Sequence, residues 1–184
     1  MTRAHEQPTL FPTSHITASE LAFHGHARLQ VSSPSFAHEA SIPERHSAYH
    51  DGRSPALSWS EGPSGTASYA ILLEDPDAPG ATPYVHWVLY NVPARVHVLP
   101  EALPVTPTLE AQGASQGVGT RGTIGYFGPR PPARDAAHRY CFEVFALDTP
   151  IDLPAGAGCD EVREAMRGHV LANGVLTGKY AARR

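Results

Sequence analysis

Two short loops in this sequence combine rigid proline residues with side chains that could hold a small ligand. The first, residues 75–79, reads Asp-Pro-Asp-Ala-Pro and precedes His86, at the head of an apolar run. The second, residues 125–132, reads Gly-Tyr-Phe-Gly-Pro-Arg-Pro-Pro and precedes His138. Because proline restricts φ and lacks an amide donor, both loops should hold few conformations. Charged groups on rigid loops between buried strands favour a small-molecule site.

His86 and His138 could bind one small anion if the fold brings both loops together. Imidazole titrates near neutral pH, and its protonated form donates from both ring nitrogens. A carboxylate from Asp75 or Asp77 beside a histidine would hold its tautomer and favour the protonated form. We therefore expect affinity for an anion to weaken as the pH rises through about 6–8.

Other interpretations of the same residues stay open. A histidine beside Trp87 can be a packed core residue, and an aspartate before proline commonly begins a turn. Two aspartates and two histidines could hold zinc, but their spacing matches no familiar ligand motif, so no metal is expected. The sequence has no Gly-x-x-x-x-Gly-Lys-Ser/Thr phosphate loop, and we expect neither a cofactor nor catalysis. A hydrolase using Asp77 and His86 is kept as an alternative.

Composition narrows the class of protein. The chain has 184 residues and a formal net charge of −4, which gives no reason to expect nucleic-acid binding. No stretch reaches the roughly 20 apolar residues of a membrane span, so no integral membrane contact is expected. The first residues lack the apolar core of a secretory signal, which predicts a cytoplasmic protein. The cysteines, Cys141 and Cys159, form no Cys-x-x-Cys motif and are expected to be buried thiols.

The patterning predicts a β-rich fold in one domain, residues 16–184, after a loose leader at residues 1–15. Apolar runs separated by glycine and proline indicate strands at residues 16–23, 28–31, 56–60, 68–74, 85–92, 138–147 and 175–180. An apolar stripe at helical spacing predicts a helix over residues 159–171, with Asn173-Gly174 as its stop. Residues 94–122 are expected to form a long irregular connection with at most one short strand.

Several motifs, taken in order, resemble a known family. They are Ser-Pro-Ala-Leu-Ser-Trp at residues 54–59, the acidic loop at 75–79, His-Trp-Val at 86–88, the proline-rich loop at 125–132 and His-Arg-Tyr at 138–140. Together they resemble the phosphatidylethanolamine-binding protein (PEBP) family, whose eukaryotic members include the Raf kinase inhibitor protein. The short form is similar to the bacterial branch, and the resemblance covers roughly residues 16–181.

The resemblance implies a large central antiparallel β-sheet, packed by a smaller sheet and a C-terminal α-helix. It also implies a small anion pocket at the edge of the central sheet. Carried over to this chain, the ligand-binding residues would be Asp75, Asp77, His86, Tyr126, Gly128, Pro131, His138 and Tyr140. The implied ligands are phosphate, phosphorylated head groups such as phosphoethanolamine, and small carboxylates.

The resemblance further implies binding to a kinase or a protease, and a homodimer. An alternative from another class is therefore an interaction or inhibitor protein whose pocket is accessory. The chain also departs from the family pattern. Arg130 stands inside the second loop, where its cation could reach an anion or point away, and residues 1–15 have no clear counterpart.

Overall fold

The structure is a computed structural model that describes residues 16–21 and 27–182. The central antiparallel sheet runs in the order β6 (Thr108–Leu109), β7 (Ala114–Gln116), β4 (Tyr84–Pro93), β3 (Ser68–Asp75), β8 (His138–Leu147) and β9 (Val170–Tyr180). The smaller antiparallel sheet consists of β1 (Val31–Ser32), β2 (Leu57–Trp59) and β5 (Val98–Leu99). The described helices are α1 (Thr17–Glu20), the 3-10 helix η1 (Glu44–His46) and α2 (Cys159–Met166).

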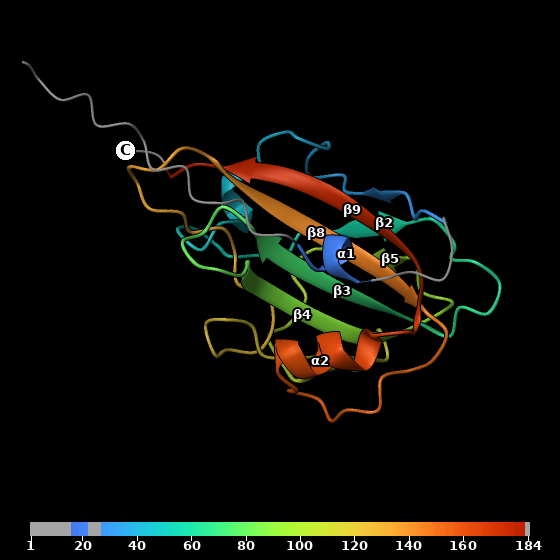
Figure 1. Ribbon diagram of the computed structural model, residues 1–184. Coiled ribbons are helices and arrows are strands. Elements are labelled where there is room, and N and C mark those ends of the chain that lie inside the picture. The colour runs from blue at the N-terminus through green and yellow to red at the C-terminus, as the bar shows by residue number, and fades with distance from the viewer. Residues whose placement is uncertain (1–15, 22–26, 183–184) are drawn as a thin grey trace, which may run out of the picture.

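The central sheet is covered on both faces, which explains its long apolar strands. One face packs against the smaller sheet, around Trp59, Trp87 and Phe142. The other face packs against α1 and α2, around Leu72 and Val162. Figure 1 shows α1 and α2 on the near side of the sheet and the smaller sheet behind it. A sheet buried on both faces needs apolar residues at consecutive positions, as β3 and β4 have. The predicted mainly β architecture, with two sheets and a C-terminal helix, is confirmed.

The predicted strand at residues 16–23 is wrong over the part that the structure describes. Residues 17–20 form α1, while Phe23 and the predicted leader at 1–15 lie outside the described residues. The amides of Thr17 and Ala18 donate to the buried carboxylates of Glu74 and Glu143, at 2.8 and 2.6 Å. These partners lie far along the chain, so no local sequence pattern could indicate the helix.

The predicted C-terminal helix is correct in place but too long. It ends at Met166 rather than Leu171, and Val170 already begins β9. The expected stop at Asn173-Gly174 is wrong, because both residues lie inside β9 and pair with β8. A Cβ on Gly174 would lie 2.1 Å from the Leu29 carbonyl oxygen, so this glycine permits a close backbone approach instead of ending a helix.

The connection over residues 94–122 is more ordered than predicted. It contains three short strands, β5, β6 and β7, where at most one was expected. Strand β7 pairs with β4 and places the side chain of Gln116 in the core, where it accepts from the Trp87 indole at 2.7 Å. No helix among the described residues has the length and apolar character needed to cross a membrane.

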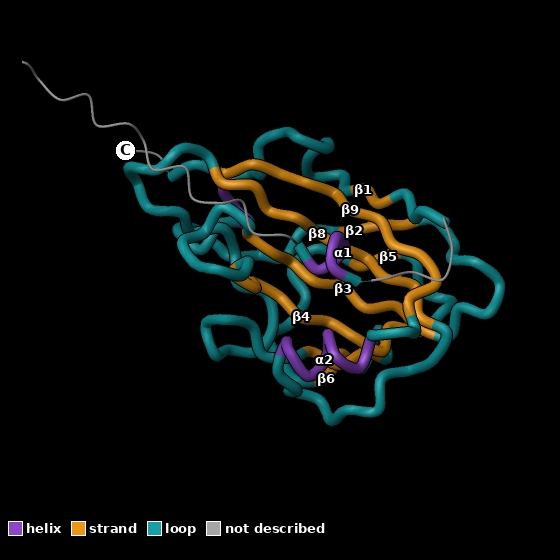
Figure 2. Tube along the Cα trace, in the orientation of Figure 1, coloured by secondary structure: helices purple, strands orange, loops and turns teal. Residues whose placement is uncertain are grey.

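Strand pairing gathers the two candidate loops at one end of the central sheet. Asp75, the last residue of β3, pairs with Tyr84, the first residue of β4. On the other side of β3, Glu74 pairs with Cys141, so β8 begins at this same end with His138. The polypeptide outside the sheets is mostly loop (Figure 2), and the loops after β3 and before β8 meet here.

Candidate functional site

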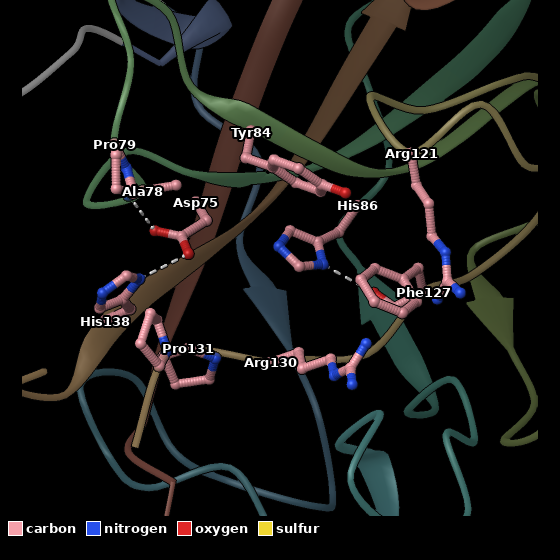
Figure 3. Close-up of a pocket in the computed structure, with 11 residues that line it drawn as sticks. Asp75, Ala78, Pro79, Tyr84, His86, Arg121, Phe127, Arg130, Pro131 and His138 are labelled. Carbon is pink, nitrogen blue, oxygen red and sulfur yellow. Dashed lines mark hydrogen bonds and ion pairs between the residues drawn. The ribbon is translucent and has the colours of Figure 1, made fainter. Parts of the chain in front are cut away.

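A cavity of about 320 Å³ opens where these strand ends and loops meet (Figure 3). Its walls are formed by Asp75, Ala78, Pro79, Tyr84, His86, Arg121, Phe127, Arg130, Pro131, Pro132 and His138. The volume lies near the lower limit for small-molecule sites. It lies at the ends of the central strands, not along a lateral edge strand of the sheet. Both histidines and both proline-rich loops singled out from the sequence therefore border the same space.

Asp75 organises one wall of the cavity. Its Oδ1 accepts the amides of Asp77 and Ala78, at 2.9 and 3.0 Å, which stiffens the acidic loop. Its Oδ2 accepts from Nδ1 of His138 at 2.8 Å. This hydrogen bond raises the pKa of the buried His138 imidazole above its ordinary value. The other ring nitrogen, Nε2, lies 3.4 Å from the carboxylate of Asp135, so His138 lies between two acids that favour its protonated form.

His86 differs from His138 in the direction of its pKa shift. Its Nδ1 donates to the Phe127 carbonyl at 2.9 Å, and its ring stacks on Phe127 with an interplanar angle of 5°. Burial lowers the pKa of His86, which keeps this imidazole neutral. Its second ring nitrogen points into the cavity in Figure 3. With the proton on Nδ1, that nitrogen is a hydrogen-bond acceptor, so the two histidines are not equivalent.

Asp77, another predicted ligand residue, does not line the cavity. Its carboxylate accepts from the backbone amide of Arg139 at 2.8 Å and from the guanidinium at 2.9 and 2.7 Å. This bidentate pair ties the acidic loop to the start of β8. Asp77 thus positions the wall that carries Asp75 and His138.

Three more of the predicted residues lie behind the cavity wall. The Tyr126 hydroxyl donates to the carbonyl of His46 at 2.8 Å. Gly128 packs against the backbone near η1, where a Cβ would lie 2.2 Å from the His46 carbonyl oxygen. The hydroxyl of Tyr140 is buried and has no hydrogen-bond partner among the described residues, and its ring edge contacts His86. Pro131 does line the cavity.

Two arginines complete the opposite side of the cavity. Arg130, whose direction the sequence left open, borders the cavity, and so does Arg121, which the sequence did not single out. The Arg121 guanidinium lies 4.4 Å from the Phe127 ring centroid. Arg121 was overlooked because it sits in the irregular segment before the second loop, where only its charge could have drawn attention.

The sequence also contains Gly-Ala-Ser-Gln-Gly at residues 113–117, which has the spacing of a hydrolase nucleophile elbow. The structure places Ser115 inside β7, paired with Tyr90 of β4 and Thr108 of β6. A nucleophile elbow is a sharp turn from a strand into a helix, so this pattern is not one. Among the described residues, no three histidine, cysteine or acidic side chains are grouped as a metal site.

Comparison with known proteins supports the resemblance seen in the motifs. A family model described as phosphatidylethanolamine-binding protein matches residues 32–181. A UPF0098 protein of Aquifex aeolicus is 38% identical over 157 residues, which cover 85% of this chain and 90% of that protein. A UPF0098 protein of Methanothermobacter thermautotrophicus is 40% identical over 152 residues, which cover 83% of this chain and 98% of that protein.

Two solved structures agree in fold and in sequence. A homologue of phosphatidylethanolamine-binding protein from Chlamydia trachomatis has a TM-score of 0.75 and 35% identity, over 84% of this chain and 98% of that one. YbcL of Escherichia coli, described as a member of the mammalian PEBP family, has a TM-score of 0.79 and 31% identity, over 85% of this chain and 100% of that one. With its motifs in order, its two sheets and its strand-end cavity, this chain belongs to the phosphatidylethanolamine-binding protein family.

Proposed function

We propose that this protein binds a small phosphate-bearing or carboxylate ligand in the strand-end cavity. The observation that carries the proposal is the charge balance of the cavity wall. The one carboxylate in the wall, Asp75, is paired with the His138 imidazole, whereas Arg121 and Arg130 form no salt bridge with any described residue. A concave site with excess positive charge attracts anions.

The ligand would meet two kinds of partner in the cavity. The arginines donate charge-assisted hydrogen bonds to anionic oxygens. The neutral His86 offers an acceptor nitrogen, which suits the hydroxyl of a protonated phosphate. Affinity is expected to weaken as the pH rises, because His138 loses its positive charge as the pH passes through its raised pKa.

Calorimetric titration with inorganic phosphate at pH 6 and pH 8 tests the proposal. Binding should be tighter at pH 6, and His86→Ala should weaken it by about tenfold or more through loss of the acceptor. His169→Ala is a control for the removal of an imidazole. His169 is hydrogen-bonded to Asp148 at 2.8 Å on the surface, at the opposite end of β8 from the cavity. Equal affinity at both pH values, or unchanged binding by His86→Ala, would show that the proposal is wrong.

The alternative hydrolase built on Asp77 and His86 receives no support from the geometry. The Asp77 carboxylate is occupied by Arg139, and the hydrogen bond of His86 goes to a carbonyl. A base that activates a protein nucleophile is hydrogen-bonded to it and is commonly oriented by a third group, and no described side chain is recorded in either position at His86. The inhibitor alternative predicts instead a protein partner whose binding tolerates His138→Ala, which a pull-down with that variant distinguishes.

A further inference from the structure

The two arginines of the cavity wall are held in place by aromatic rings and not by acids. The guanidinium carbon of Arg121 lies 4.4 Å from the Phe127 ring centroid, and that of Arg130 lies 5.6 Å from the Tyr49 ring centroid. Stacking on a ring face leaves the in-plane N–H donors of a guanidinium available. Both side chains therefore keep their hydrogen-bonding capacity for a ligand.

Both arginines border the part of the cavity near Phe127. In Figure 3 Arg121 lies to the right of Phe127 and Arg130 below it, while Asp75 and His138 lie at the left of the view. They come from different segments, one before and one inside the second loop. A ligand that contacts the neutral His86 and extends toward the arginines would therefore meet positive charge at that side of the cavity.

The acids near the cavity are already paired with cations. Asp75 accepts two loop amides and the imidazole of His138, which uses three of its roughly four acceptor positions. Asp77 is bound by Arg139. Asp135 lies 3.4 Å from His138, outside the cavity wall, and is 42% exposed, so solvent screens its charge. An ammonium group in the cavity would thus find no unpaired carboxylate in the wall.

From this arrangement we propose that the cavity selects ligands with two anionic groups, such as a diphosphate, over a single phosphate or a zwitterionic head group. The proposal rests on the proposed function and specifies its ligand class. One anionic group occupies the His86 end, and the second is shared by Arg121 and Arg130. The cavity volume of about 320 Å³ suits a ligand of this size. The ammonium of phosphoethanolamine would instead be placed beside like charge.

Calorimetry at pH 7 and constant ionic strength can measure this selectivity, with phosphate, pyrophosphate and phosphoethanolamine as probes. The wild-type protein should bind pyrophosphate about tenfold more tightly than phosphate, and phosphoethanolamine more weakly than phosphate. The double variant Arg121→Gln/Arg130→Gln should weaken the binding of both anions, but that of pyrophosphate about tenfold more than that of phosphate, so that the preference for pyrophosphate disappears. Both residues are exposed, so the variant should fold, and a thermal melt checks this.

Arg95→Gln provides a control for the general effect of removing positive charge. Arg95 is exposed and follows β4 at the end of that strand opposite His86, so its loss should leave the selectivity unchanged. If phosphate binds but pyrophosphate shows no preference, or if the preference survives in the double variant, this inference is wrong while anion binding stands. If none of the probes binds, both the inference and the proposed function are wrong.

Discussion

Glu74 and Asp75, the last two residues of β3, lie in different environments. Glu74 lies in a closed polar cluster beneath α1 and α2, which we define as Thr17, Ala18, Glu74, Glu143 and Arg163. Asp75 lies in the open cavity beside His138. Both regions contain carboxylates and cations at close range, but Glu74 and Glu143 are fully buried, whereas Asp75 lines the cavity.

In the closed polar cluster the hydrogen-bonding groups are nearly all used within the protein. Glu74 is 0% exposed, accepts the amide and the hydroxyl of Thr17 at 2.8 and 2.6 Å, and forms a salt bridge with Arg163. Glu143, also 0% exposed, accepts the amide of Ala18 at 2.6 Å. Burial, with the nearby charge of Glu74, raises the pKa of Glu143 well above its usual value.

The comparison of the cluster with the cavity shows that residue type alone does not identify a binding site. The closed polar cluster uses its carboxylates to receive the first amides of α1 and to fix it on the sheet. The cavity instead keeps an acceptor on His86 and donors on two arginines that no described residue occupies with a hydrogen bond or salt bridge. Unoccupied hydrogen-bonding capacity next to open space distinguishes the candidate site.

The largest effect is expected in the closed polar cluster. Arg163→Met should lower the free energy of unfolding by about 3–5 kcal/mol, because it leaves the Glu74 carboxylate buried without a counter-ion. Urea denaturation at pH 7 measures the change. Arg167→Met, which removes an exposed cation from the end of the same helix, should cost less than about 0.5 kcal/mol. Equal losses in the two variants would contradict a special role for Arg163.

A smaller effect is expected in the cavity from Asp75→Asn. Asparagine keeps the oxygen that receives the loop amides but removes the charge beside His138. The expected loss of stability is about 1.5–3 kcal/mol at pH 6, the usual worth of a hydrogen bond to a charged group.

The sign of its pH dependence follows from the raised pKa of His138. The pair with Asp75 contributes full stability below about pH 6.5, the unfolded pKa, and this contribution is lost as the pH rises through the folded pKa. The wild-type advantage over Asp75→Asn should therefore shrink between pH 6 and pH 9, as measured by urea denaturation. An advantage that stays constant over this range would show that His138 is not the titrating partner.

The smallest effect is expected for Glu143→Gln. Because the pKa of Glu143 is raised, the folded protein keeps this carboxyl proton to a higher pH than the unfolded chain does. Stability therefore falls as the pH rises from the ordinary glutamate range toward the raised pKa, and glutamine removes this loss. The free energy of unfolding of the variant should be within about 1 kcal/mol of the wild-type value at pH 5, and it should increase relative to the wild type at pH 8. Chemical denaturation at both pH values measures this; a large loss at pH 8 would mean that the cluster needs an ionised Glu143.

Local sequence predicted the parts of the fold that depend on neighbouring residues. The strand predicted at residues 138–147 has those bounds in the structure, because aromatic and β-branched residues follow one another between two loops. The alternation of Leu57 and Trp59 likewise predicted their shared buried face. Glycines, prolines and acids that form the two loops are also consecutive in the chain, so their motifs could be recognised directly.

Features that depend on distant partners could not be predicted in this way. Helix α1 depends on carboxylates from β3 and β8, and the early start of β9 depends on its pairing with Leu147. The sequence suggested that Asp77 faces a ligand, but in the structure its carboxylate accepts hydrogen bonds from the Arg139 guanidinium. The intrinsic helix propensity of a residue amounts to a few tenths of a kcal/mol, so tertiary contacts of this kind easily outweigh it.

Patterns of neighbouring residues were enough to predict the long strands, the two stiff loops and the acids and imidazoles near them, since these features follow from local order in the chain. The folded environment shifted the pKa values of the two imidazoles in opposite directions. Asp75, sixty-three positions earlier, raises the pKa of His138, and burial lowers the pKa of His86. Desolvation and ion pairing are properties of a folded environment, so they appear only when separate strands come together.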